Sequence, residues 1–203
     1  VNLKSLSKIL KYAEVQKLEN FDTSTTYNSN KILFDNLNYK SKINLKIIPN
    51  KKWENLDHIY KVFEKIKNNK KLKLYSVMFH DPNFLFTSQG QKIYKSLLVL
   101  KKKNFFKKIG VSIYDFQDLS FILKNFKINI IQCPFSILDR RLISDGWLKL
   151  MKSKKVEIHS RSIFFQGLLT NENLTKHKYF KKWRPNFQKW FNDIYENDLN
   201  ATD

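Results

Sequence analysis

The sequence has few of the residues that crosslink or interrupt a fold. Among its 203 residues are one cysteine, four glycines and four prolines. Because Cys133 has no second cysteine with which to form a disulfide within the chain, we expect a reducing, cytoplasmic environment. The low glycine and proline content leaves little material for linkers. No apolar run approaches the roughly 18 residues of a membrane-spanning helix, so we expect no membrane partner.

Acidic residues are also scarce beside basic ones. The 18 Asp and Glu residues stand against 38 Lys and Arg, which gives a formal charge of +20. Such a charge can indicate binding to nucleic acid or another polyanion. Here, however, the lysines are spread along the whole chain among Asn and Ile, as at 67–71, a bias that an AT-rich genome also produces. Without a zinc-finger, helix-turn-helix or RNA-binding motif, nucleic acid is not the expected partner, and a basic polyanion-binding protein stays an alternative.

Potential metal ligands are sparse as well. The sequence has four histidines and one cysteine, and it contains neither an HxxxH nor a CxxC spacing. We therefore expect no metal requirement.

What the sequence does contain is a regular alternation of two kinds of segment. Short apolar runs predict strands that end at or cover 20–22, 42–48, 72–79, 108–112, 128–132 and 156–160. Longer segments with apolar residues three or four positions apart predict helices at 3–18, 31–37, 56–66, 91–102, 116–123, 142–151 and 183–195.

This alternation predicts an α/β fold, because strands separated by helices form a parallel sheet with covering helices. The absence of a dinucleotide-binding glycine fingerprint favours a (β/α)8 TIM barrel over a doubly wound sheet. A complete barrel has about 250 residues, so this chain holds about six βα units. We predict one incomplete barrel domain over residues 1–203, either a fragment or a truncated homologue that lacks the first strand and the last βα unit.

Polar residues stand where a TIM barrel carries its functional groups, at the carboxyl ends of the strands. Asp22 ends the first predicted strand and Tyr27 follows it, while Lys46 lies in the second strand and His80 ends the third. We predict that these four side chains meet on one face of the barrel. Taken singly, each has an ordinary alternative: a turn cap for the aspartate, a surface position for the tyrosine and lysine, and a turn contact for the histidine.

Several motifs in the sequence resemble those of the aldo-keto reductase family. Ile43-Asn44-Leu45-Lys46 resembles its catalytic-lysine strand, and Phe79-His80-Asp81-Pro82 its catalytic-histidine strand. Ile109-Gly110-Val111-Ser112 resembles its Gly-Val-Ser motif. The remaining similar segments are 22–30, 131–136, 137–141 and 160–169, and all occur in the family's order.

The resemblance implies reduction of a small aldehyde or ketone with hydride from NADPH or NADH. Tyr27 would be the proton donor and His80 would orient the carbonyl group of the substrate. Lys46 would make the phenol a better acid, because a nearby ammonium group favours the phenolate, and Asp22 would be the partner of that lysine. A catalytically inactive truncated barrel is the rival interpretation.

The resemblance also implies cofactor contacts. Ser112 and Gln132 match positions that hydrogen-bond the nicotinamide carboxamide, and Arg161 and Ser162 match a further cofactor segment. Many members have a tyrosine at the position of Arg161, where a guanidinium can also stack on a ring but repels an oxidised nicotinamide. Trp53 and the stretch at 83–86 are expected either to line an apolar substrate pocket or to cap the core.

Overall fold

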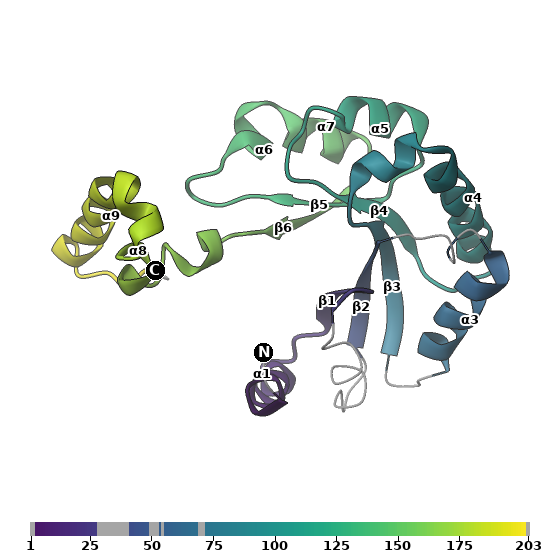
Figure 1. The fold of residues 1–203 in the computed structure, drawn as a ribbon, viewed down its shortest axis with the longest axis horizontal. Coiled ribbons are helices and arrows are strands. Elements are labelled where there is room, and N and C mark those ends of the chain that lie inside the picture. Colours follow the sequence, from purple (N-terminus) through teal and green to yellow (C-terminus); the bar gives the residue numbers. More distant parts are fainter. Residues whose placement is uncertain (1–2, 28–40, 49–52, 54, 69–71, 202–203) are drawn as a thin grey trace. The chain divides into compact units, whose positions relative to one another are not determined.

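The computed structural model describes residues 3–27, 41–48, 53, 55–68 and 72–201. These residues form a six-stranded sheet whose strands follow one another in sequence order (Figure 1). The strands are β1 (Asn20–Ser24), β2 (Ser41–Ile47), β3 (Leu72–Phe79), β4 (Lys108–Ser112), β5 (Ile130–Pro134) and β6 (Glu157–Arg161). The pairings from β1 through β5 are parallel. Sequential parallel order with helices between strands confirms the predicted α/β, incomplete TIM-barrel fold.

Helices connect the strands and continue after β6. They are α1 (Leu3–Val15), α3 (Leu56–Lys67), α4 (Ser88–Lys102), α5 (Leu119–Asn125), α6 (Arg141–Ser144), α7 (Trp147–Ser153), α8 (Glu172–Thr175) and α9 (Arg184–Glu196). Short 3-10 helices are η2 (Pro82–Phe86), η3 (Phe165–Gly167) and η4 (Lys178–Trp183). None of the helices in the described part of the chain is long and apolar enough to cross a membrane.

The chain divides into two compact units. The first unit comprises Val1–Cys133 and Met151–His159, and the second comprises Pro134–Leu150 and Ser160–Asp203. In the first unit, α3 packs on β3 and α4 on β4, so these helices form an outer layer over the strands (Figure 1). The interpretation of residues 1–203 as a single domain stays a prediction.

The helix α3 shows why these segments are helical. Asn55 caps its amino end, because the Asn55 side chain accepts hydrogen bonds from the backbone N–H groups of Asp57 and His58. Ile59, Phe63 and Ile66 follow at the spacing of one helical face and are buried. Burying that face against the sheet is what stabilises a helix of this length.

A local conformation accounts for two differences between the predicted and the observed helices. The helix predicted at 142–151 is two helices, because Gly146 has φ +79° and separates α6 from α7. The helix predicted at 116–123 begins at Leu119, since Asp115 accepts from the N–H of Gln117 and holds the preceding residues in a turn. The helix predicted at 31–37 lies outside the described residues.

A glycine allows β4 and β5 to lie close together. Gly110 on β4 pairs with Ile130 on β5, and a Cβ atom at position 110 would stand 2.1 Å from the Ile130 carbonyl oxygen. No side chain fits at that distance. The glycine of the Gly-Val-Ser motif therefore has a packing function in this chain.

Candidate active site

The centre of the site is an ion pair between neighbouring strands. Ser24 on β1 is opposite Lys46 on β2, and Asp22 shares the face of Ser24 because strand side chains alternate. The Lys46 ammonium donates to Asp22 Oδ2 over 2.7 Å. The lysine is only 5% exposed, and a buried ammonium requires such a carboxylate. The two predicted residues are thus in contact.

Tyr27 and His80 stand beside this pair. The Lys46 Nζ atom lies 5.8 Å from the centroid of the Tyr27 ring. The Tyr27 and His80 rings meet edge to face, with centroids 6.4 Å apart. The backbone N–H of His80 donates to the Ile47 carbonyl, which fixes the end of β3 against β2. The structure therefore brings all four predicted side chains together, with Tyr27 42% exposed and accessible from solvent.

A serine that was not predicted also belongs to this group. Ser24 is fully buried, and its Oγ lies 3.4 Å from His80 Nδ1 and 3.1 Å from Thr26 Oγ1. The signal that would have found Ser24 is strand alternation, because it stands two residues after Asp22 on the same strand face. Its hydroxyl is a candidate for setting the tautomer of the histidine.

Two of the predicted cofactor-binding residues belong to the same hydrogen-bonded network. Gln132 on β5 accepts from Lys46 Nζ over 3.0 Å and donates to Asp22 Oδ1 over 3.0 Å. Ser112 on β4 donates to the same Gln132 oxygen over 3.2 Å. Both side chains are buried. Amide and hydroxyl groups of this kind can hydrogen-bond a carboxamide, so they fit the nicotinamide end of the expected cofactor.

The other two predicted cofactor residues lie in the second unit. Arg161 ends β6, and its carbonyl accepts from the N–H of Phe135. Ser162 follows with φ +58°, a conformation that is uncommon for residues other than glycine. Their role toward a cofactor stays a prediction.

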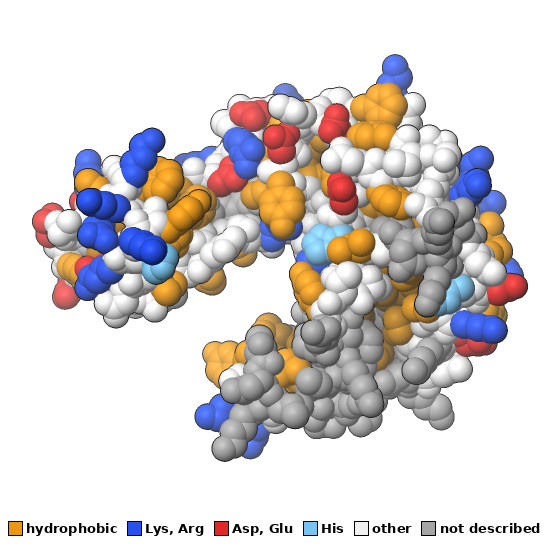
Figure 2. All heavy atoms as spheres, viewed as in Figure 1, with side chains coloured by type: hydrophobic (Ala, Val, Ile, Leu, Met, Phe, Trp, Pro, Cys, Tyr) orange, Lys and Arg blue, Asp and Glu red, His pale blue; other side chains and the backbone are white. Residues whose placement is uncertain are grey.

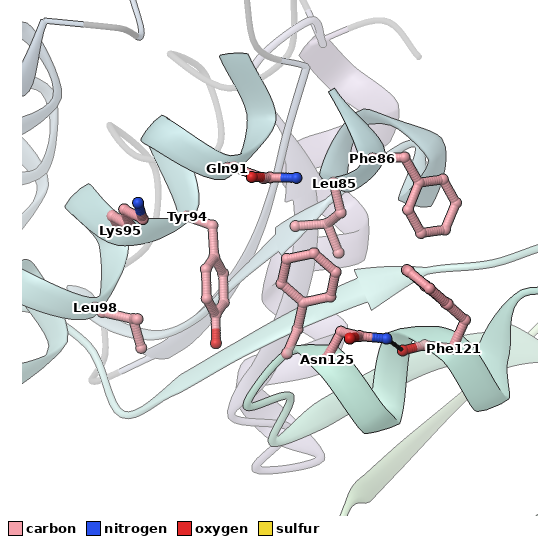
Figure 3. Close-up of a pocket in the computed structure, with 9 residues that line it drawn as sticks. Leu85, Phe86, Gln91, Tyr94, Lys95, Leu98, Phe121 and Asn125 are labelled. Atoms are coloured by element: carbon pink, nitrogen blue, oxygen red, sulfur yellow. Dashed lines mark hydrogen bonds between the residues drawn. The ribbon is translucent and has the colours of Figure 1, made fainter. Parts of the chain in front are cut away.

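The expected pocket residues divide between two environments. Trp53 is buried and packs edge-on against Phe63, 6.0 Å between centroids, as a core residue does. Leu85 and Phe86 instead line an apolar cavity of about 440 Å³ between η2, α4 and α5, where Phe86 also contacts Phe121 (Figure 3). This cavity lies among the helices and contains none of the four predicted catalytic residues.

The second unit carries a concentration of basic residues. Residues 172–190 hold six Lys and Arg residues against the single acidic residue Glu172, a net charge of +5 with histidine neutral. Lys and Arg side chains gather over the region of α8 and α9 in Figure 2. An apolar cavity of about 530 Å³ lies in the same region, with Trp183, Phe187 and Trp190 among its lining residues.

A metal centre finds no support in the described residues. Within them, no group of three or more His, Cys, Asp or Glu side chains could hold a metal ion. Cys133 is buried. That no metal is required stays a prediction.

Comparison with solved structures gives the same fold. The glycerol dehydrogenase from Gluconobacter oxydans has a TM-score of 0.68 at 14% identity, covering 96% of this chain and 69% of that one. The holo form of an aldo-keto reductase from Bacillus halodurans has a TM-score of 0.62 at 17% identity, covering 84% and 60%. A variant of Gox0644 in complex with NADPH has a TM-score of 0.65 at 17% identity, covering 87% and 65%.

These likenesses, all at low identity, concern the fold. The chain spans 60% of the length of the Bacillus halodurans enzyme and 65% of that of Gox0644. A comparison with curated protein sequences gave no significant match. The model of the aldo/keto reductase family, in contrast, matches residues 1–203. On this match, the chain belongs to the aldo/keto reductase family.

Proposed function

We propose that this protein reduces an aldehyde or ketone with hydride from NADPH or NADH and a proton from Tyr27. One observation supports the proposal most directly. The buried Lys46 ammonium is paired with Asp22 at 2.7 Å and lies 5.8 Å from the centroid of the Tyr27 ring. A fixed positive charge beside a phenol favours loss of the phenolic proton, which is what a general acid requires.

The reaction needs a proton at oxygen when hydride reaches carbon. The proton leaves the Tyr27 hydroxyl for the carbonyl oxygen of the substrate, and the product is an alcohol. The negative charge left on the phenolate is stabilised by Lys46, whose low exposure keeps solvent from screening the interaction. Asp22 keeps the ammonium in place during this transfer.

His80 is the second group that would touch the substrate. When the Ser24 hydroxyl donates to Nδ1 at 3.4 Å, the neutral imidazole carries its proton on Nε2. That N–H can donate to the carbonyl oxygen and orient it toward Tyr27. A neutral donor of this kind polarises the carbonyl group without competing for the proton of Tyr27.

The cofactor supplies the hydride, and the protein supplies binding and orientation. Ser112 and Gln132 would hold the carboxamide, since both side chains are buried on adjacent strands and carry hydrogen-bonding groups. The Gox0644 variant, whose fold resembles that of this chain, is in complex with NADPH. That complex supports a nicotinamide cofactor for this protein. The substrates of the proposed reaction are small aldehydes or ketones.

The proposal is tested by binding first and turnover second. We expect NADPH or NADH fluorescence to change on addition of the protein, and a panel of small aldehydes and ketones to be reduced. Tyr27→Phe should bind the cofactor as the wild type does and lose about 10²–10⁴-fold in turnover. Tyr12→Phe is the matched control, because Tyr12 is an exposed tyrosine on α1.

Two results would overturn the proposal. If the protein changed the fluorescence of neither NADPH nor NADH, the proposed oxidoreductase activity would be excluded. Cofactor binding with no turnover of any carbonyl compound would favour the catalytically inactive barrel instead.

A further inference from the structure

The Gln132 side chain connects strands that are not neighbours in the sheet. It reaches from β5 to Asp22 on β1 and Lys46 on β2, although β3 and β4 stand between β2 and β5. Gln132 as a whole is only 5% exposed. Asp22, Lys46 and Gln132 form a closed ring, in which each residue is hydrogen-bonded to the other two. We call this arrangement the Asp22–Lys46–Gln132 ring.

The chemistry of the ring fixes the orientation of the amide. Oε1 accepts from the Lys46 ammonium and the Ser112 hydroxyl, and Nε2 donates to the Asp22 carboxylate. A flipped amide would direct N–H groups at the ammonium and an oxygen at the carboxylate, which would replace two attractions by two repulsions. Gln132 therefore matches the polarity of both charged partners at once.

We propose that Gln132 is a positioning residue for Lys46, beyond the contact with the cofactor that the family resemblance implies. Without Gln132, the Lys46 ammonium would keep Asp22 as its charged partner. The Asp22 side chain is 38% exposed and contacts the ammonium from β1 alone. With it, the ammonium is held from two strands at 2.7 Å and 3.0 Å. The inference rests on the proposed function, since it concerns how Lys46 assists Tyr27.

The ring also limits how Gln132 can bind a carboxamide. Its oxygen already accepts two hydrogen bonds, and one N–H of the amide is used by Asp22. The other N–H has no partner among the described residues, so it can donate to a ligand while the ring stays closed. One side chain can thus serve the cofactor and Lys46 together.

The test measures cofactor binding and kcat separately. Gln132→Met keeps the side-chain length and opens the ring, and Gln117→Met makes the same substitution at an exposed glutamine as the control. If Gln132 only binds cofactor, Gln132→Met weakens NADPH binding and leaves kcat at saturating cofactor within about 3-fold of wild type. The proposal predicts that Gln132→Met also loses about 10- to 100-fold in kcat, as misplaced catalytic groups do, and that Gln117→Met changes neither quantity.

The Tyr27→Phe background supplies a readout that a merely structural role would not move. If Gln132 acts through Lys46 on Tyr27, adding Gln132→Met to Tyr27→Phe should lower kcat at saturating cofactor by less than about 3-fold, because groups that act together are not additive. A loss of the same size in both backgrounds would overturn the proposal.

A second measurement needs neither cofactor nor turnover, so it separates this inference from the proposed function. In the protein without cofactor, Gln132→Met should lower the urea midpoint of unfolding less in a Lys46→Met background than in wild type. Such coupling is expected only if the two side chains act together. Additive midpoint shifts would mean that the ring does not exist, whatever the protein catalyses. Coupling without any carbonyl reduction would retain the ring and refute the proposed function.

Discussion

Tyr75 on β3 donates a hydrogen bond to Glu157 on β6 over 2.7 Å, although β4 and β5 stand between these strands in the sheet. In a flat sheet three strand spacings would separate them by about 14 Å. The sheet must therefore curve within the first unit, so that side chains from β3 and β6 meet on its concave face. Glu157 also accepts from Lys108 and is paired with His159, so one carboxylate connects three other side chains.

The first prediction concerns this carboxylate. Glu157→Gln removes the charge that pairs with Lys108, and the carboxylate is 29% exposed, so hydrogen bonds to it are partly shielded from water. We expect a loss of about 1–2 kcal/mol in the free energy of unfolding, measured in urea. Glu19→Gln is the control, because the Glu19–Lys42 pair is exposed and should contribute little. Equal effects of the two substitutions would contradict the prediction.

The second prediction concerns acid pH. Burial raises the pKa of Glu157, but hydrogen bonds from Lys108, Tyr75 and His159 outweigh it, and the pKa lies below the usual 4.5. Between the lowered value and 4.5 the unfolded chain binds more protons, so this contribution to stability is complete above pH 4.5 and is lost as the pH falls further. Urea unfolding of wild type and Glu157→Gln should therefore converge toward acid pH. A difference that grew on acidification would refute this sign.

The third prediction concerns the contact of β4 with β5. Gly110→Ala should destabilise the fold by at least about 1–3 kcal/mol, because its Cβ would collide with the backbone of Ile130. Gly146→Ala is the comparison, since Gly146 has open space around it and only its φ of +79° opposes a side chain. We expect about 1 kcal/mol there, both measured as shifts in urea unfolding. A larger loss at Gly146 than at Gly110 would argue against the close approach.

The fourth prediction concerns the tautomer of His80. Ser24→Ala should lower turnover by about 3- to 10-fold without changing NADPH binding, because the removed hydroxyl lies 3.4 Å from His80 Nδ1. Ser96→Ala on α4 is the matched control, since the Ser96 hydroxyl donates an exposed hydrogen bond to the Lys92 carbonyl of its own helix. If Ser24→Ala weakened cofactor binding as much as turnover, Ser24 would not act through His80.

The fifth prediction tests whether Tyr27 and Lys46 act as one unit. Lys46→Met should lose about as much turnover as Tyr27→Phe, and the double variant should be little worse than either, because groups that act together are not additive. Asp22→Asn should be milder, since Lys46 itself remains and keeps its hydrogen bond to Gln132. Rates of carbonyl reduction at saturating cofactor provide the measurement. Multiplicative losses in the double variant would assign independent roles.

Much of the fold was predictable because its signals are local. The strands at 72–79 and 108–112 are where the apolar runs place them, and the helix predicted at 183–195 is α9. The single long helix at 142–151 was wrong, because apolar spacing continues through Gly146 while the backbone does not. Periodicity reports which face is buried, and it is insensitive to one residue with positive φ.

The site was predictable in part for a similar reason. Asp22, Lys46 and His80 lie at or near strand ends, which a barrel brings to one edge. Ser24 was missed because the first strand was predicted to end at Asp22, whereas β1 continues to Ser24 and alternation then places both residues on one face. The contact between Gln132 and Asp22 depends on how far the sheet curves between strands that are not neighbours, and no pattern within a strand encodes that curvature.

The hydrogen bond from Gln132 to Asp22 joins residues 110 positions apart in the chain. Contacts of such long sequence separation form slowly, because a long loop must close before any interaction rewards it. We therefore expect the Asp22–Lys46–Gln132 ring to close late during folding, after β2 through β4 have paired. Appearance of carbonyl reduction during refolding would then lag behind recovery of helical circular dichroism. In this protein, activity would report the completion of the sheet rather than its initiation.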